Sequence, residues 1–324
     1  MRALLCKTLG TYDQLTVETV DEPQPGPGEV LIDVRAAGIN FPDLLIVQGK
    51  YQFKPPLPFV PGGECAGVVS AVGEGVQRVK VGDPVIGVGL AGAFAEKMTL
   101  AEAATLPMPE GMDFGTAAGI AFTYGTSYYA LKQRAGLAEG ETLLVLGAAG
   151  GVGTAAVELG KLMGARVIAA ASSEEKLDAA EAAGADLRIN YTTESLKNKV
   201  KELTDGQGAD VVYDPVGGDY SEQALRAIGW YGRFLVIGFA AGEIPKIPLN
   251  LALLKSAQIV GVFWGSWTQR DPAESARNFL ELQQMFESGR LTPRVTAFPL
   301  DDHQDALGAL AERRAKGKLV LTMT

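Results

Sequence analysis

The sequence predicts an α/β protein in which a mostly antiparallel β domain precedes a doubly wound parallel sheet of six strands. Short β-like runs, separated by Gly, Pro and acidic turn residues, fill the first third of the chain. From about Leu143, short apolar runs alternate instead with segments of helical period. Because strands joined by crossover helices lie parallel and are covered on both faces, this alternation indicates a doubly wound sheet. The length of 324 residues suits two domains of roughly 150 residues each.

The first domain is predicted from β-like runs and one short helix. The runs cover residues 3–6, 15–20, 30–36 and 65–72. Before the last of these runs, Asn40 can cap a helix that has Pro42 in its first turn, where a missing N–H costs little. Gly49 can end this helix.

The second domain is predicted from strand-like runs with helical segments between them. The runs cover residues 143–146, 166–170, 187–190, 210–214, 233–237 and 258–262. A helix then starts at Asp271, a last helix ends near Gly317, and residues 318–321 form a strand-like run. Since these segments do not extend the alternation, we expect them to return to the first domain. The expected domains are residues 1–122 with 267–324, and residues 123–266.

Composition excludes several classes of protein. With 47% hydrophobic and 21% charged residues, the chain lies within the range of folded globular proteins. Its 29 basic and 38 acidic side chains give a net charge of −9, so nucleic acid is not expected as the main partner. No apolar run reaches the roughly 18 residues of a membrane helix, and no membrane partner is expected. The only cysteines, Cys6 and Cys65, lie in apolar stretches, which favours a reducing, cytoplasmic location.

A glycine-rich turn follows the first strand of the second domain. Residues 143–146 run into residues 147–153 (GAAGGVG), after which a helix begins. The motif GxGxxG is incomplete, because Ala148 stands at the first glycine position. Its place at the start of a strand and helix series still predicts that Gly150, Gly151 and Val152 bind a dinucleotide pyrophosphate. The alternative is a tight turn without a ligand.

The end of the second strand indicates which dinucleotide. An NAD site has Asp or Glu there to bind the ribose 2′-OH, whereas this chain has Ala171. Ser172 and Lys176 follow, and a hydroxyl and an ammonium suit a 2′-phosphate, so the predicted cofactor is NADPH. Ser172 can also cap the next helix, which is compatible with that role. Glu174 and Glu175 oppose an anion, and we expect their side chains to point to solvent.

The chain resembles the zinc-free quinone oxidoreductase branch of the medium-chain dehydrogenase/reductase superfamily, which includes zeta-crystallin. The resemblance covers essentially the whole chain. The matching segments are residues 38–43 (GINFPD), 61–69 (PGGECAGVV), 72–76 (VGEGV), 81–83 (VGD), 148–153 (AAGGVG), 190–191 (NY), 213–218 (YDPVGG) and 261–265 (GVFWG). The resemblance implies a GroES-like β domain interrupted by a Rossmann domain.

The resemblance also implies the residues of a site. Asn40 would lie near the nicotinamide and substrate, Asp43 would support its loop, and Tyr51 would line the pocket and offer a phenol. Asn40 as a helix cap and Tyr51 as ordinary packing are the alternatives. Further cofactor contacts carried over from the family are Thr126, Tyr191, Phe239, Phe263 and Arg314, the last near the 2′-phosphate.

A metal site is not expected. Zinc-dependent members of the superfamily have Cys and His ligands where this chain has Asn40 and Gly63, and only Glu64 is retained. Tetrahedral zinc needs three or four Cys, His or carboxylate ligands, and the chain has a single histidine, His303, expected at the surface.

Without a metal, the expected reaction is direct hydride transfer from NADPH to a quinone or an α,β-unsaturated carbonyl. One alternative is a reductase of the enoyl-CoA or acryloyl-CoA type. The other is an NADPH-binding protein with a structural or sensing role. By analogy with the family we expect a homodimer, for which residues 258–262 offer a suitable last strand.

Overall fold

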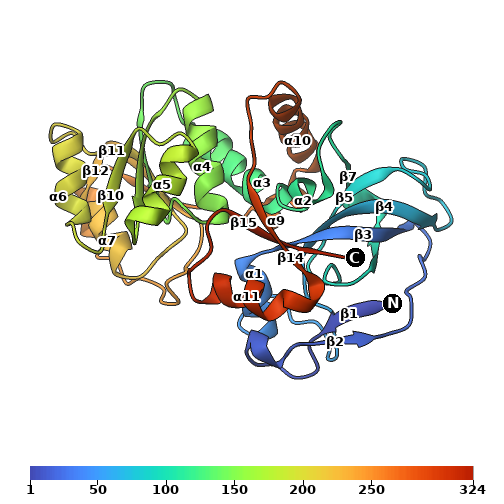
Figure 1. Ribbon diagram of the computed structural model, residues 1–324. Coiled ribbons are helices and arrows are strands. Elements are labelled where there is room, and N and C mark those ends of the chain that lie inside the picture. Colours follow the sequence, from blue (N-terminus) through green and yellow to red (C-terminus); the bar gives the residue numbers. More distant parts are fainter. Residues whose placement is uncertain (324) are drawn as a thin grey trace. The chain divides into compact units, whose positions relative to one another are not determined.

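The computed structural model describes residues 1–323 and divides them into two units. The first unit comprises Met1–Phe122 together with the chain from Pro293 on, and the second unit is Thr123–Thr292. The first unit is drawn in blue and cyan at one end of the chain and in red at the other in Figure 1.

The first unit is built on a mostly antiparallel sheet. Its strand order is β14-β15-β3-β4-β5-β7, with β6 also paired to β3, while β1 and β2 form a separate ladder. The strands are β1 (Arg2–Leu5), β2 (Thr16–Thr19), β3 (Glu29–Ile39), β4 (Glu64–Val72), β5 (Pro84–Val88), β6 (Lys97–Ala101), β7 (Thr105–Pro107), β14 (Val295–Pro299) and β15 (Lys318–Thr322). The returning strand β15 lies antiparallel to β3, so the last part of the chain completes this sheet.

Short helices surround this sheet. They are η1 (Tyr12–Gln14), α1 (Phe41–Val47), η2 (Glu102–Ala104), α2 (Phe114–Ala117), η4 (Leu300–Asp302) and α11 (His303–Ala311). As predicted, Asn40 stands at the N-cap of α1, where the carboxylate of Asp43 accepts a hydrogen bond from its backbone N–H over 2.7 Å. Helix α11 ends at Ala311, earlier than the Gly317 expected from the sequence.

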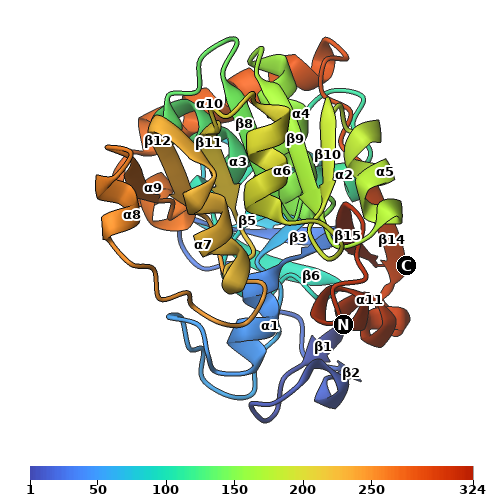
Figure 2. The same ribbon diagram turned by 90° about the vertical axis from the view of Figure 1, so that its left-hand side faces the viewer.

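The second unit contains a six-stranded parallel sheet in the order β10-β9-β8-β11-β12-β13. Each predicted strand is present, as β8 (Thr142–Leu146), β9 (Arg166–Ala171), β10 (Leu187–Asn190), β11 (Ala209–Asp214), β12 (Ile228–Val236) and β13 (Gln258–Gly261). The labelled strands β12, β11, β8, β9 and β10 follow one another in this order in Figure 2. This is the strand order of a Rossmann domain, and the predicted fold class is confirmed.

Helices cover both faces of the parallel sheet. Those between its strands are α4 (Gly151–Leu162), α5 (Glu174–Ala182), α6 (Leu196–Leu203), α7 (Asp219–Arg226) and α8 (Asn250–Leu253). Helices α4 and α5 pack together, α6 and α7 pack together, and Figure 1 shows the two pairs on opposite faces. Because both faces are covered, the strand side chains are fully buried, as for Leu144, Ile168 and Val212.

The prediction that residues 267–324 all return to the first domain is wrong for the segment up to Thr292. Helices α9 (Trp264–Arg270) and α10 (Pro272–Glu287) belong to the second unit, where they contact α3 (Ala121–Tyr129) and the π-helix η3 (Ala130–Ala135). The Trp267 ring stacks on Tyr129 with 4.2 Å between centroids, and the Lys132 ammonium lies 2.6 Å from the Glu281 carboxylate. These contacts join side chains that are distant in sequence, so the alternation of strands and helices along the chain could not predict them. Within residues 1–323, no helix combines the length and apolarity needed to cross a membrane.

Candidate cofactor and catalytic site

The predicted cofactor residues of the second unit follow the carboxyl ends of its strands. Since β8–β13 run parallel, these ends share one edge of the sheet, where ligands of doubly wound folds bind. Ser172 follows β9, Tyr191 follows β10, Phe239 follows β12 and Phe263 follows β13. The glycine turn follows β8, which lies between β9 and β11, at the point where the strand order reverses.

The glycine turn has a conformation that only small residues allow. Gly147 has a φ of +56°, and its carbonyl accepts a hydrogen bond from the N–H of Gly150 over 2.9 Å. A Cβ atom on Gly153 would lie 2.2 Å from that same carbonyl oxygen. Helix α4 therefore starts directly at the turn, with Gly150 as its N-cap. The N–H groups of Gly151 and Val152 have no partner one turn earlier in the helix, and this arrangement fits a pyrophosphate.

Helix α3 supports this turn through a residue that sequence reasoning missed. The Ser127 hydroxyl lies 3.0 Å from the carbonyl of Val152 and 2.8 Å from the phenol of Tyr213. Burial raises the pKa of Tyr213, so its phenol remains protonated. Thr126, predicted to contact the nicotinamide, precedes Ser127 on the same helix. A polar group on Tyr213 inside a buried strand was the available signal.

A carboxylate shapes the loop after β11. Asp214 accepts hydrogen bonds from the N–H groups of Val216 and Gly217 over 2.8 and 2.9 Å. Phe239 lies against this loop, because a Cβ atom on Gly217 would be 3.0 Å from its ring. The structure thus brings Phe239 to the loop that neighbours the glycine turn, where Val216 approaches Gly147.

The segment after β9 presents the predicted pair of donors. The Lys176 ammonium lies 2.9 Å from the Ser172 hydroxyl, and Ala171 is buried at the end of the strand. Helix α5 is capped by Ser173, whose hydroxyl accepts a 3.4 Å bond from the N–H of Lys176, so the expected cap at Ser172 is wrong. This frees the Ser172 hydroxyl from the helix terminus for its contact with Lys176.

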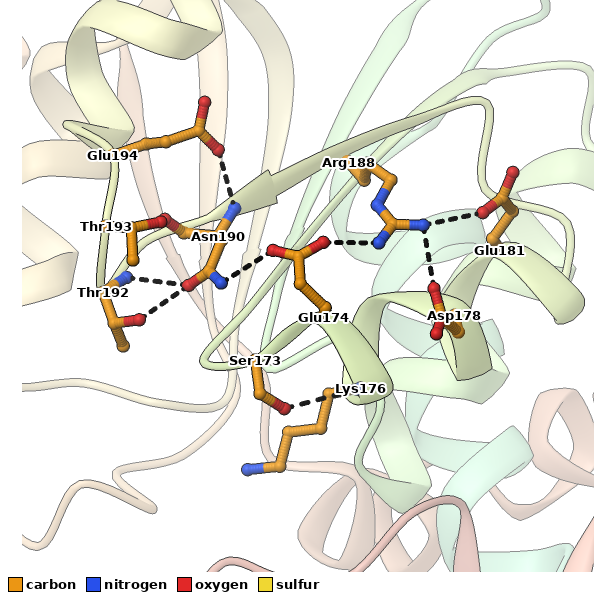
Figure 3. Close-up of polar contacts among 10 residues, drawn as sticks. All are labelled: Ser173, Glu174, Lys176, Asp178, Glu181, Arg188, Asn190, Thr192, Thr193 and Glu194. Carbon is orange, nitrogen blue, oxygen red and sulfur yellow. Dashed lines mark hydrogen bonds and ion pairs between the residues drawn. The ribbon is translucent and has the colours of Figure 1, made fainter.

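Glu174 is exposed, as expected. Its carboxylate is also held in place, because it lies 2.5 Å from the Arg188 guanidinium and accepts a 2.8 Å hydrogen bond from Asn190 (Figure 3). Glu175 is exposed, as expected.

Three other predicted contacts have different surroundings. The Tyr191 ring lies 4.2 Å from that of Tyr220, and Phe263 is exposed after β13. Arg314 belongs to the first unit, where its exposed guanidinium pairs with Glu312 at 2.8 Å. Their contacts with a cofactor remain predictions.

The first unit holds a buried polar cluster around Asn40. The Asn40 side-chain amide donates to Glu64 over 2.9 Å, and its carbonyl oxygen accepts from the Lys318 ammonium over 2.6 Å. Lys318 also pairs directly with Glu64, whose other carboxylate oxygen accepts a 3.0 Å bond from the N–H of Phe122. Asn40, Glu64 and Lys318 are 8%, 0% and 5% exposed. The cluster therefore fixes the orientation of the Asn40 amide.

Asp43 and Tyr51 are coupled to this cluster. Burial raises the pKa of the Asp43 carboxyl from 3.8 to about 7, although the hydrogen bond from Asn40 opposes the shift. Burial, and then the negative charge on Asp43, raise the pKa of the Tyr51 phenol. Tyr51 also packs against the hydrophobic core, in agreement with its alternative reading.

We expect Asp43→Asn to remove a pH dependence of stability. In the folded state the raised pKa lets the Asp43 carboxyl keep its proton up to about pH 7, whereas in the unfolded state the carboxyl releases it near pH 4. Between about pH 4 and pH 7, Asp43 therefore lowers the free energy of unfolding as the pH rises. Relative to the variant, the wild type should lose up to about 1.4 kcal/mol per pH unit there. Urea unfolding at pH 4 to 8 measures this, with the exposed Asp21→Asn as control. Parallel curves for wild type and Asp43→Asn would contradict the prediction.

Contrary to the expectation from the sequence, the single histidine does not lie at the surface. His303 is buried at the start of α11, and its ring nitrogens lie 3.1 Å from the Leu300 carbonyl and 3.3 Å from the Leu15 carbonyl. Over residues 1–323, no three His, Cys, Asp or Glu side chains gather as metal ligands would.

Comparisons with known proteins match both units. The family described as "Alcohol dehydrogenase GroES-like domain" matches residues 26–110, and "Zinc-binding dehydrogenase" matches residues 151–281. Quinone oxidoreductase-like protein 2 homolog of Nematostella vectensis is 42% identical over 99% of this chain and 88% of its own length.

Solved structures agree. The crystal structure of Escherichia coli quinone oxidoreductase complexed with NADPH has a TM-score of 0.92 at 30% identity, covering 100% of both chains. The CurK enoyl reductase structure has a TM-score of 0.89 at 28% identity, covering 100% of this chain and 99% of its own. With a GroES-like unit, a Rossmann unit and these relatives, the chain belongs to the quinone oxidoreductase branch of the medium-chain dehydrogenase/reductase superfamily.

Proposed function

We propose that this protein is an NADPH-dependent, metal-free oxidoreductase that transfers a hydride to a quinone or an α,β-unsaturated carbonyl. The observation that carries the proposal is the segment after β9, where Ser172 and Lys176 present a hydroxyl and an ammonium 2.9 Å apart. Ala171 stands where an acid would bind a ribose 2′-OH and repel a 2′-phosphate. The NADPH bound by the E. coli relative supports the same cofactor.

The second unit would bind the cofactor with residues at the carboxyl ends of its parallel strands. Gly150, Gly151 and Val152 would bind the pyrophosphate through the start of α4. Ser172 and Lys176 would bind the 2′-phosphate, assisted by Tyr191. Thr126, Phe239 and Phe263 would contact the nicotinamide end. When bound, NADPH supplies the hydride.

Residues of the first unit would donate a hydrogen bond to the oxygen of the acceptor. As hydride arrives, negative charge develops on a quinone or carbonyl oxygen, and a hydrogen-bond donor at that oxygen stabilises it. Tyr51 suits this role because a phenol is protonated at neutral pH and can donate a hydrogen bond, and burial raises its pKa further. Asn40 would orient the substrate, with its own amide fixed by Glu64 and Lys318.

The metal-free part of the proposal rests on how Glu64 is bonded. Its carboxylate oxygens already receive the Lys318 ammonium, the Asn40 amide and the N–H of Phe122. A buried cation beside the only retained ligand disfavours a metal ion by charge repulsion. Burial also raises the pKa of the neighbouring Cys65 thiol to about 12, so it is not the thiolate that zinc binds.

The test is NADPH oxidation with a quinone, an enone and an enoyl-CoA thioester measured side by side, with and without a chelator. Turnover with the quinone or enone, unchanged by the chelator, is the expected result. Loss of activity with the chelator, or tightly bound stoichiometric zinc, would overturn the metal-free assignment.

The relation to CurK enoyl reductase favours an enoyl thioester as the second candidate substrate. Preferential turnover of the acyl-CoA substrate in the same panel would select it. A protein that binds NADPH but turns over none of the three acceptors would have the structural or sensing role instead.

We also propose a homodimer that pairs through β13. This strand lies at the edge of the six-stranded sheet, and its outward backbone groups can pair with a second copy. Ile259 on this strand is exposed, and so are Trp230, Tyr231 and Leu253 near this side of the sheet. Ile259→Lys should convert the dimer to a monomer in light scattering, whereas the exposed control Leu280→Lys on α10 should not. A monomeric wild type, or a dimeric Ile259→Lys, would refute this pairing.

The proposed location is the cytoplasm. Cys6 and Cys65 are both free and buried, so this part of the fold depends on no disulfide. Such cysteine usage is typical of proteins from reducing compartments.

A further inference from the structure

A network of charges surrounds the first turn of α5, close to the proposed 2′-phosphate site. Glu174, the first residue of α5, lies 2.5 Å from Arg188 on β10. The same guanidinium lies 2.9 Å from both Asp178 and Glu181, one and two turns further along the helix. Figure 3 shows Arg188 between these carboxylates. Arg188 therefore joins its own strand β10 to the acidic face of α5.

Asn190 holds Glu174 from a second side. Its side-chain N–H group donates to the carboxylate over 2.8 Å, and its carbonyl oxygen accepts from the hydroxyl of Thr192 over 2.7 Å. Asn190 is itself buried at the end of β10. The Glu174 carboxylate is thus fixed by two groups of β10, and the same network orders the loop that carries Tyr191 and Thr192.

The position of Glu174 matters because Ser172 and Lys176 are each two residues away from it. In Figure 3 the Glu174 carboxylate and the Lys176 ammonium leave the first turn of α5 in different directions. The hydrogen bonds from Asn190 and then from Arg188 lower the pKa of Glu174 below its usual value. The carboxylate therefore stays charged at neutral pH, and its position, not its protonation, decides what it does to a nearby anion.

We propose that Arg188 is a specificity-determining residue that never contacts the cofactor: by holding Glu174 against Asn190, it keeps a negative charge away from the 2′-phosphate. The inference rests on the proposed function, because it presupposes NADPH in this site. Without Arg188 only the hydrogen bond from Asn190 would hold Glu174, so the carboxylate could turn toward Lys176, pair with its ammonium and repel the phosphate. Arg188 is thus a positioning residue, and its loss should act on NADPH and not on NADH.

The test is a fluorescence titration of NADPH and NADH into the wild type and Arg188→Met. The wild type should prefer NADPH. Arg188→Met should weaken NADPH binding about tenfold and change NADH binding by less than about twofold. A wild-type preference for NADH would contradict the proposed cofactor. A wild-type preference for NADPH that Arg188→Met leaves unchanged would contradict only the role of Arg188.

Matched double variants separate position from net charge. Arg188→Met combined with Glu174→Gln, with Asp178→Asn or with Glu181→Gln has the same net charge in each case. Only the combination with Glu174→Gln should restore the wild-type ratio of dissociation constants. Equal restoration by all of them would mean that the general field of the helix is responsible, and would overturn the proposal.

A second single variant keeps the test independent of how well Arg188→Met folds. Glu174→Asp retains the charge, but its side chain is too short to reach Arg188 and Asn190 as Glu174 does. It should also weaken NADPH binding selectively. Unchanged NADPH binding in Glu174→Asp would likewise overturn the proposal.

Discussion

Replacing Lys318 with methionine should lower the free energy of unfolding by about 3–5 kcal/mol. The variant has a similar side-chain volume, but it leaves the fully buried Glu64 carboxylate without its ammonium partner. It also removes the donor that holds the carbonyl oxygen of Asn40. Urea unfolding followed by circular dichroism measures the loss, and NADPH oxidation by the surviving folded protein reports on the orientation of Asn40.

Two controls define the origin of that effect. Lys318→Met combined with Glu64→Gln should recover most of the lost stability, because no unpaired charge then remains. Lys97→Met removes an ion pair with Asp33 and Glu22 near the surface of the same unit, and should cost about 1 kcal/mol or less. If Lys318→Met were no less stable than Lys97→Met, the buried pair would not be a stabilising element.

Lys176→Ala should weaken NADPH binding by roughly 10- to 150-fold and leave NADH binding nearly unchanged. A charge-assisted hydrogen bond to a phosphate contributes about 1.5–3 kcal/mol, which corresponds to that range. The wild-type contact of Lys176 with Ser172 shows that the ammonium already lies at the end of β9. Titration of both cofactors into both proteins provides the measurement.

Lys161→Ala is the matched control for this variant. Lys161 lies in the last turn of α4, at the other edge of the same sheet, and pairs with Asp186 at 2.7 Å. Lys161→Ala removes one positive charge from the same unit, as Lys176→Ala does, and should leave the dissociation constants of NADPH and NADH unchanged. Equal losses for NADPH and NADH in Lys176→Ala would mean that Lys176 is structural.

The strands of the second unit could be predicted because they are buried on both faces. Runs such as residues 143–146 are continuously apolar and have glycine turns or helices on either side. The strands β5, β6, β7 and β14 gave weaker signals, since they are short and several of their residues are partly exposed. The place of α9 and α10 depends on contacts such as Trp267 on Tyr129, which no local pattern records.

The buried polar cluster around Asn40 shows which site residues could not be predicted from the sequence. Asn40, Asp43 and Tyr51 came from a family resemblance, and Glu64 was seen only as a remnant of a metal site. Lys318 was missed because 254 positions separate it from Glu64. A lysine at the head of the apolar run of residues 318–321 was the available signal, because a charge there has to be buried with a partner.

The place of β15 in the first sheet sets an order of events during translation. The strand that pairs with β3 and brings Lys318 to Glu64 leaves the ribosome only after the whole second unit has been made. We therefore expect the second unit to fold first on the ribosome. Until β15 arrives, the nascent first unit presents an unpaired edge of β3 and an uncompensated carboxylate at Glu64. Chains that stall before this point are the ones that chaperones and proteases should recognise.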